Sequence, residues 1–292
     1  MLVDILPEVG GKIAQIRDKS TDRDLLIPPQ RPYRPIPING DWLKHDTSGM
    51  DDCFPNVAAG IYPESPWAGA TLHNLGEWTH FAWSVEKFER QEITLRAEGH
   101  ALPYTAIRKL RFADERTLHF SYRVLNRGSH AFRYLWSAHP LIAVGERFEL
   151  QFPPGDLSFQ VFPPTAETFI WPIFKGTRIS SEWIPPGTTL KIFVTGFSEG
   201  TCGLALPECS LRFHFDPYVL PSVGIWFNNF GFPRDSTRPF RCIAVEPCTT
   251  SSDLLDQIDA SAYPRIAPGA ASQWEMQLTI LSNAPAKQDP ET

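Results

Sequence analysis

The chain has 292 residues, 42% of them hydrophobic, which is enough apolar material for a sizeable core in one or two domains. Its 28 prolines are scattered along the sequence and exclude long helices, because proline breaks helix interiors. The formal net charge of −6, without any run of lysine or arginine, argues against nucleic acid as a partner.

Three features bear on location and cofactors. Residues 1–7 (MLVDILP) lack the basic and apolar regions of a secretion signal, and no apolar run approaches the roughly 18 residues of a membrane span. The five cysteines are an odd number, which indicates reduced thiols, so we expect a cytoplasmic protein that contacts no membrane. Cys202, Cys209 and His214 form a conceivable zinc set, but no CxxC pair supports it, and we expect neither a metal nor another cofactor.

The segment from Gly40 to Ser84 is long, weakly periodic and rich in polar and aromatic residues. Long ordered loops on a rigid scaffold often carry binding residues. Residues 72–83 (LHNLGEWTHFAW) include His73, Trp78 and His80, a density of polar and aromatic groups that suits a carbohydrate site. Residues 51–56 (DDCFPN) add adjacent carboxylates to the same segment.

Period-two alternation of apolar and polar residues predicts strands along the rest of the chain. Arg108–Phe112 and Leu118–Val124 flank a short turn and predict a hairpin. The same alternation predicts further strands over Leu190–Val194, Leu211–Phe215 and Trp274–Ile280. One short helix is expected over Ser252–Ile258, with a serine at the N-cap. No repeat or linker divides the chain, so we expect one all-β sandwich domain over residues 1–282 and a disordered tail over 283–292.

His139 ends an aromatic, apolar strand in residues 134–140 (YLWSAHP). A histidine in this position is either a proton donor at neutral pH or a half-buried residue with satisfied hydrogen bonds, and the segment alone favours neither.

Arg212, His214 and Asp216 share one face of a strand whose other face is apolar. A carboxylate beside a histidine can hold sugar hydroxyls through charge-assisted hydrogen bonds. The alternative is a solvated sheet face on which Asp216 pairs with Arg212 or His214.

In residues 241–247 (RCIAVEP), Glu246 shares a face with Cys242 and Ala244, whose small side chains leave room for a ligand. Pro247 is expected to end this strand. The alternative is an exposed carboxylate at a strand terminus, because charged residues are mostly solvated. Motifs typical of nucleotide-binding proteins, α/β-hydrolases and zinc proteases are absent from the sequence.

Taken in order, these segments resemble the galactose mutarotase-like superfamily, which includes the aldose 1-epimerases. The segments that carry the resemblance are Gly10–Ile16, Gly49–Asn56, Leu72–His73 with Trp83, Val124–Gly128, Ser137–Pro140, Phe213–Pro217 with Ile225–Phe230, Val245–Pro247 and Pro268–Trp274. The resemblance implies a β-supersandwich with a concave carbohydrate-binding cleft.

The resemblance also implies roles for single residues. Glu246 would be the general base and His139 the general acid, while His73 and Asp216 would bind and orient the sugar. We expect Asp52, Asn56, Trp78 and His80 to contribute further substrate contacts. Opening a hemiacetal ring needs one base and one acid and no metal or nucleotide.

The expected function is that of an aldose 1-epimerase acting on a small, unphosphorylated sugar, in a monomer or homodimer. Many family members carry an arginine just after the Phe54–Pro55 position, where this chain reads NVAAGI, and a phosphate dianion needs a fixed guanidinium. Two alternatives stay open. One is a carbohydrate-binding protein without turnover. The other is a lyase or hydrolase of the same fold, in which Glu246 works with Asp216 or Asp52, since an inverting hydrolase needs two carboxylates about 6.5–9.5 Å apart.

Overall fold

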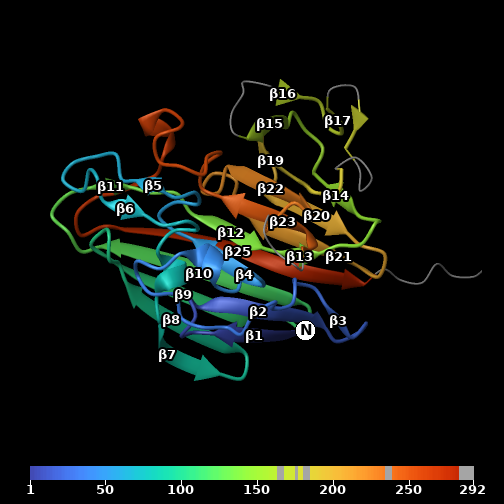
Figure 1. Ribbon diagram of the computed structural model, residues 1–292, viewed down its shortest axis with the longest axis horizontal. Helices are drawn as coiled ribbons and strands as arrows, with labels where there is room; N and C mark the ends of the chain where they lie inside the picture. The colour runs from blue at the N-terminus through green and yellow to red at the C-terminus, as the bar shows by residue number, and fades with distance from the viewer. Residues whose placement is uncertain (163–167, 175–176, 180–184, 234–238, 283–292) are drawn as a thin grey trace, which may run out of the picture.

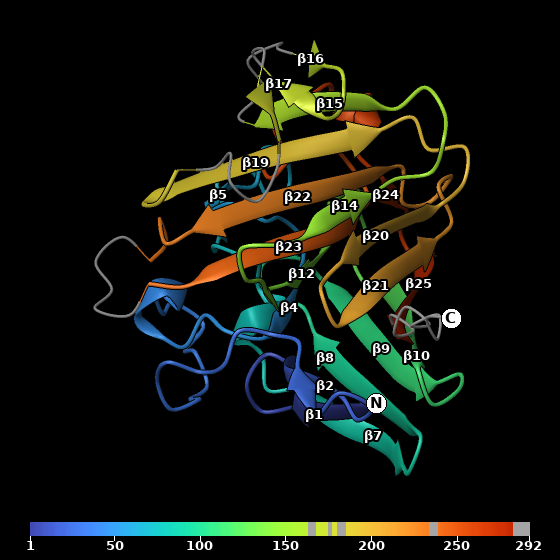
Figure 2. The ribbon, with the colours of Figure 1, turned by 90° about the vertical axis from the view of Figure 1, so that its right-hand side faces the viewer.

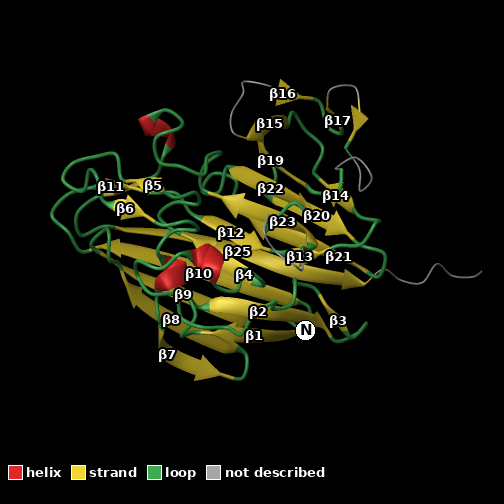
Figure 3. Cartoon of the chain, in the orientation of Figure 1, coloured by secondary structure: helices red, strands yellow, loops and turns green. Residues whose placement is uncertain are grey.

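The computed structural model of the chain describes residues 1–162, 168–174, 177–179, 185–233 and 239–282. Two large antiparallel sheets are stacked face to face (Figures 1 and 2). The helical content of these residues is limited to three short 3-10 helices (Figure 3), η1 (Trp42–Lys44), η2 (Trp78–His80) and η3 (Ala260–Ala262). None of the described helices is long and apolar enough to cross a membrane. The all-β prediction is confirmed, and the predicted tail, 283–292, lies outside the described residues.

The eleven-stranded sheet carries both predicted catalytic residues, His139 and Glu246. Along its main path the neighbouring strands are β1 (Leu2–Leu6), β2 (Lys12–Asp18), β4 (Met50–Cys53), β12 (Ser137–Pro140), β23 (Arg241–Cys248), β22 (Ser222–Asn229), β19 (Thr188–Thr195), β15 (Ser158–Phe162) and β16 (Thr168–Phe169). Two short strands join this path at the side, β3 (Arg23–Asp24) beside β2 and β13 (Ile142–Ala143) beside β23.

The eight-stranded sheet covers one face of the first. Its neighbouring strands are β14 (Glu149–Gln151), β20 (Thr201–Ala205), β21 (Cys209–Phe215), β25 (Ala271–Ser282), β10 (Thr117–Asn126), β9 (Tyr104–Phe112), β8 (Glu92–Glu98) and β7 (Ser84–Glu89). Three small two-stranded sheets are formed by β5 (Gly60–Ile61) with β6 (Thr71–Leu72), β11 (Phe132–Arg133) with β24 (Arg265–Ile266), and β17 (Ile173–Phe174) with β18 (Thr177–Arg178).

The predicted strands are confirmed, with two corrections. The expected hairpin is β9–β10, and the other alternating segments are β19, β21 and β25. The helix expected from Ser252 to Ile258 is wrong. The Tyr263 hydroxyl accepts hydrogen bonds from the amides of Gln257 and Ile258, and the Ser252 hydroxyl bonds the backbone of Leu254, so side chains replace helical bonds.

The second correction concerns the end of β23. Pro247 does not end this strand, which continues to Cys248, with Pro247 paired to Val223 of β22. Proline removes one donor, but its fixed φ is compatible with an extended chain.

An aromatic stack fills the space between the two large sheets. The rings of Trp78 and Trp274 lie 6.5 Å apart and within 8° of parallel, and Tyr122 stacks on Trp274 at 5.5 Å. Trp136 packs against Tyr122 with ring centroids 4.7 Å apart. Each such ring buries a large apolar area, so this stack is a major contribution to the core.

The two faces of β23 meet different surroundings. Ile243 and Val245 belong to the main core, whereas Cys242 and Ala244 belong to a separate apolar cluster with Leu141 and other residues. The predicted alternation of this strand is therefore confirmed. Its outer face, which also carries Glu246, is covered rather than exposed to solvent.

Candidate functional site

A row of residues crosses the outer face of the eleven-stranded sheet at its centre. His139 on β12 is paired in register with Asp51 on β4, and Glu246 on β23 is paired with Gly224 on β22. The pairing of Ser137 with Cys248 fixes the register between β12 and β23. This register places His139 beside Glu246, on the same face of the sheet.

His139 and Glu246 form a close polar pair. The His139 Nδ1 lies 2.7 Å from the Glu246 Oε1. Glu246 is completely buried, and 8% of His139 remains exposed. The other ring nitrogen of His139, Nε2, bonds to none of the described residues. The carboxylate therefore holds one side of the imidazole, and Nε2 is the nitrogen available to a ligand.

Lys191 completes the cluster from β19. Its ammonium lies 2.8 Å from the second oxygen of Glu246, Oε2, and 2.6 Å from Oδ1 of Asp253, which follows β23. One cation thus serves two buried carboxylates. We refer to His139, Glu246, Lys191 and Asp253 as the charged cluster.

Opposing effects set the protonation of the charged cluster. Burial works to raise the pKa of Glu246, but the charges and hydrogen bonds of Lys191 and His139 prevail and lower the pKa to about 2. Burial would lower the pKa of Lys191, yet Asp253 and Glu246 raise it above its usual value. Burial, helped by the charge of Glu246, raises the pKa of Asp253. At neutral pH, Glu246 is therefore an anion and Lys191 a cation.

Two predicted histidines form a pair nearby. His73 follows β6 and His80 lies in η2, and their ring centroids are 4.7 Å apart. The His80 ring nitrogens face the Thr79 hydroxyl at 3.0 Å and the Gly40 carbonyl at 3.3 Å. Burial lowers the pKa of both histidines, which keeps them neutral at pH 7.

The histidine pair does not contact the charged cluster, but strand β4 lies between the pair and the cluster. Thr79, next to His80, lines a small cavity together with Asp51. Asp51 is the residue paired with His139. A substrate-binding role for His73 and His80 stays a prediction.

Asp52 and Trp78 lie on the other side of the eleven-stranded sheet. Asp52 accepts a hydrogen bond from the Tyr122 hydroxyl at 2.9 Å and forms an ion pair with Arg108, also at 2.9 Å. Trp78 is completely buried in the aromatic stack. Both side chains therefore contribute to the packing between the sheets, and a substrate-binding role for them stays a prediction.

Asn56 has a structural role in the same region. It is buried, and its amide donates to the carbonyls of Ala58 and His73, both at 2.7 Å. These bonds hold the loop that carries His73. A direct contact of Asn56 with a sugar stays a prediction.

Asp216 does not join the charged cluster. It lies just after β21 in the eight-stranded sheet, is exposed, and accepts a hydrogen bond from the amide of Tyr218 at 2.9 Å. Arg212 and His214 share its exposed face, as predicted, but neither pairs with it.

The conceivable zinc set is not assembled. Cys209 lies on the buried face of β21, whereas His214 points to the exposed face. No group of three metal-ligating side chains gathers anywhere in the described part of the chain. All five cysteines are unpaired and buried.

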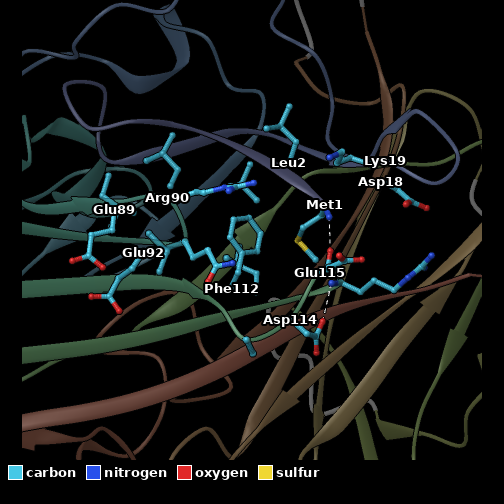
Figure 4. Close-up of a pocket in the computed structure, with 18 of the residues that line it drawn as sticks. Met1, Leu2, Asp18, Lys19, Glu89, Arg90, Glu92, Phe112, Asp114 and Glu115 are labelled. Atoms are coloured by element: carbon cyan, nitrogen blue, oxygen red, sulfur yellow. Dashed lines mark hydrogen bonds between the residues drawn. The ribbon is translucent and has the colours of Figure 1, made fainter.

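A spacious cavity lies elsewhere. It has a volume of about 890 Å³ and is bounded by β1 and by the turns that join β7 to β8 and β9 to β10 (Figure 4). Met1, Leu2 and Phe112 line its apolar part. Because no predicted site residue lines this cavity, we place the candidate site at the charged cluster.

Known structures share this fold. The chain is similar to a galactose mutarotase-like protein from Lactobacillus casei ATCC 334, with a TM-score of 0.71 and 15% identity over 95% of this chain and 96% of that one. A candidate aldose 1-epimerase from Escherichia coli K12 gives a TM-score of 0.70 at 15% identity, over 96% of this chain and 95% of that one. A galactose mutarotase-like protein from Clostridium acetobutylicum gives 0.65 at 14% identity, over 96% and 92%.

No protein-family model and no curated protein matches the sequence. At 15% identity or less, the structural likeness establishes the fold and leaves the activity to be argued from the site. The chain has the galactose mutarotase-like fold, as the sequence resemblance predicted.

Proposed function

We propose that this protein is an aldose 1-epimerase-type isomerase of an unphosphorylated sugar, with His139 and Glu246 as its acid–base pair. The observation that carries the proposal is the 2.7 Å contact between His139 Nδ1 and Glu246 Oε1. These are the two residues that the resemblance names, and they meet on one face of the central sheet although 107 positions separate them in sequence. The shared fold supports the same reading.

The chemistry of anomer exchange fits this pair. Ring opening removes the proton of the anomeric hydroxyl, breaks the bond from C1 to the ring oxygen and leaves a proton on that oxygen. Both oxygens are bonded to C1, so one imidazole nitrogen can serve them in turn. Nε2 of His139 accepts the hydroxyl proton and then returns a proton to the ring oxygen as the carbonyl forms. Rotation about C1–C2 and reversal of these steps give the other anomer.

Glu246 acts through His139 in this arrangement. The resemblance makes Glu246 the direct base, but its two oxygens face His139 and Lys191 and the side chain is completely buried. Its negative charge holds the proton on Nδ1, which leaves the lone pair of Nε2 free, and it stabilises the imidazolium formed when Nε2 accepts a proton. We therefore assign proton exchange to His139 and the supporting charge to Glu246.

Trp226 offers a wall for the sugar. Its ring lies beside that of His139, with centroids 5.8 Å apart. Aromatic rings pack well on the apolar face of a sugar, while polar groups take its hydroxyls.

The balance of charge supports a neutral substrate. Lys191 already serves two carboxylates, and no arginine is among the described side chains that contact His139, Glu246 or Lys191. Among the described side chains of the charged cluster, a phosphate dianion would find no unshared cation.

The hydrolase alternative loses its proposed partners. The Asp52 side chain enters the space between the sheets, and Asp216 belongs to the end of a strand in the other sheet. Neither carboxylate is among the contacts of Glu246, His139 or Lys191.

Polarimetry tests the proposal. Freshly dissolved α-anomers of hexoses, pentoses and amino or deoxy sugars are followed with the native protein, His139→Ala, Glu246→Gln and the control His214→Ala, which removes an exposed histidine of β21. We expect acceleration that the first two substitutions abolish and the control retains. Calorimetric sugar binding without any acceleration would instead support a carbohydrate-binding protein without turnover.

A further inference from the structure

We infer that Lys191 is a positioning residue of the proposed reaction and that it fixes Glu246 against His139. Asp253 holds the lysine in place, and Gly224, which lacks a side chain, leaves room for it to reach Glu246. The inference rests on the proposed function. It concerns a residue that the sequence patterns did not single out.

Lys191 reaches Glu246 across an intervening strand. β19 and β23 are both neighbours of β22, so their backbones are separated by two strand spacings, roughly 10 Å. The register pairs Lys191 with Trp226 and Glu246 with Gly224. The lysine side chain must therefore extend diagonally over β22 to bring its ammonium within 2.8 Å of Glu246 Oε2.

Gly224 leaves the path for this side chain open. A Cβ atom at this position would lie 2.7 Å from Glu246 Oε2 and 3.3 Å from Lys191 Cε. The first distance is shorter than real Cβ contacts and the second is tight. Any larger residue would push the two charged groups apart, so a glycine at this position allows Lys191 and Glu246 to approach each other closely.

The ammonium is also held from its other sides. Asp253 Oδ1 lies 2.6 Å from it, and the ring of Phe193 lies 5.1 Å from it, within the range of a cation–π contact. Lys191 and Asp253 are each 10% exposed as side chains. Contacts with Glu246, Asp253 and Phe193 restrict the Lys191 ammonium to one position, and the ammonium in turn fixes the Glu246 carboxylate.

Stability alone is a weak reason for such a cluster. Taking charges out of water is costly, and buried ion pairs replaced by apolar residues of similar volume often give proteins that are equally or more stable. A buried lysine that holds a carboxylate, which in turn holds the His139 imidazole through Nδ1, is better explained by the geometry of that imidazole.

The titratable groups around Glu246 determine at which pH its carboxylate is protonated. They are His139 from β12, Lys191 from β19, Asp253 after β23, and the thiols of Cys53, Cys242 and Cys248. Burial raises the pKa of each thiol, so the thiols are uncharged at neutral pH. Without Lys191, burial is opposed mainly by His139, and Glu246 is protonated at a higher pH.

The experiment compares Lys191→Met, Lys191→Arg and the control Lys109→Met, which removes a partly exposed lysine of β9 that pairs with Glu92, far from the charged cluster in the other large sheet. Initial mutarotation rates are measured over pH 4 to 8 on the sugar that the native protein turns over best. We expect Lys191→Met to lower kcat about a hundredfold, the loss typical of a misplaced reacting group, with KM little changed. The acid limb of its pH profile moves to higher pH, Lys191→Arg recovers part of kcat, and the control behaves as native protein.

Two results would overturn the inference while leaving the proposed function intact. One is a native kcat and pH profile for Lys191→Met. The other is a loss in KM alone. If Lys191→Met does not fold, Asp253→Asn is measured in the same way. This substitution removes the carboxylate that holds the Lys191 ammonium and leaves the charge of Lys191 itself unchanged. An unchanged kcat would again overturn the inference.

Failure of the proposed function is a separate result, namely native protein that accelerates no sugar. In that case the nitrogen chemical shifts of the His139 ring, measured by NMR in native protein and Lys191→Met, decide the positioning role. A shift of the Nδ1 signal upon substitution supports it, and identical spectra contradict it.

Discussion

Glu246 and Lys191 belong to strands that are not neighbours, yet their charged atoms lie 2.8 Å apart over Gly224. This relationship ties three strands to one carboxylate, and the fourth strand, β12, brings His139 to its other oxygen. The sheet thus assembles a proton-exchanging group and its supporting charges from segments far apart in sequence.

The pH dependence of stability should reveal the ionised state of Glu246. Its pKa falls from 4.5 to about 2 in the folded protein. A lowered folded-state pKa contributes stability above the unfolded pKa, and this contribution is lost as pH falls from about 4.5 towards 2. The shift corresponds to about 3 kcal/mol. Urea unfolding from pH 7 to pH 2 should show a smaller loss for Glu246→Gln than for native protein.

Asp52, whose pKa is raised by burial, is present in both proteins, so its titration does not distinguish them. The pKa of Asp253, which burial and the charge of Glu246 both raise, is lower in Glu246→Gln, so the comparison reports Glu246 together with this neighbour. A substitution at the exposed Glu275 serves as control and should leave the native pH dependence in place. Parallel curves for native protein and Glu246→Gln would contradict an ionised, ion-paired Glu246.

Gly224→Ala should impair the reaction without a change of any charged residue. The added methyl group meets Glu246 Oε2 and Lys191 Cε, so the ion pair must open. We expect a loss of mutarotation rate of at least about tenfold, as for a modest misplacement of a reacting group. Gly145→Ala is the matched control, because a Cβ atom there meets nothing within 4 Å. Equal rates for the two variants would count against the close approach.

Trp226→Ala should act mainly on sugar binding. The Trp226 ring lies beside that of His139, with centroids 5.8 Å apart, and is proposed as an apolar wall for the sugar. Loss of such a contact costs about 1.4 kcal/mol, which corresponds to a roughly tenfold higher KM or Kd. Kinetics and calorimetry with the preferred sugar check this value. An unchanged Kd would place the sugar elsewhere.

Trp78→Ala distinguishes a role in core packing from the predicted substrate contact of that residue. The ring is completely buried and stacks on Trp274 and Tyr122, so its removal leaves a large cavity. We expect the free energy of unfolding to fall by about 3–5 kcal/mol, measured by urea unfolding. The folded fraction should bind sugar as native protein does, whereas a weakened Kd in folded protein would support a direct role for Trp78.

Much of the fold was predictable because each large strand repeats with period two. The buried and exposed faces of β21 and the two environments of β23 follow from Phe213, Phe215, Ile243 and Val245. The helix expected after Ser252 does not form, because the hydroxyl of Tyr263, which lies just beyond the segment, accepts hydrogen bonds from the amides of Gln257 and Ile258, and the pattern within the segment does not indicate this.

The site was predictable only in part. His139 and Glu246 end or nearly end apolar strands, and short motifs drew attention to them. Lys191 was missed because a lysine in an alternating strand is typical of a solvated face, and only the register of β19, β22 and β23 shows what it reaches. The burial of Trp78 and Asp52 between the sheets was not predictable, because the density of polar and aromatic residues in a segment does not tell which side of the sheet each side chain enters.

The most direct test of the account is the mutarotation rate of unphosphorylated aldoses with native protein, His139→Ala and Glu246→Gln, measured by polarimetry at pH 7. The account predicts that native protein accelerates at least one aldose and that each substitution lowers the rate by about a hundredfold or more. Acceleration that survives in His139→Ala would contradict the assignment of proton exchange to that imidazole.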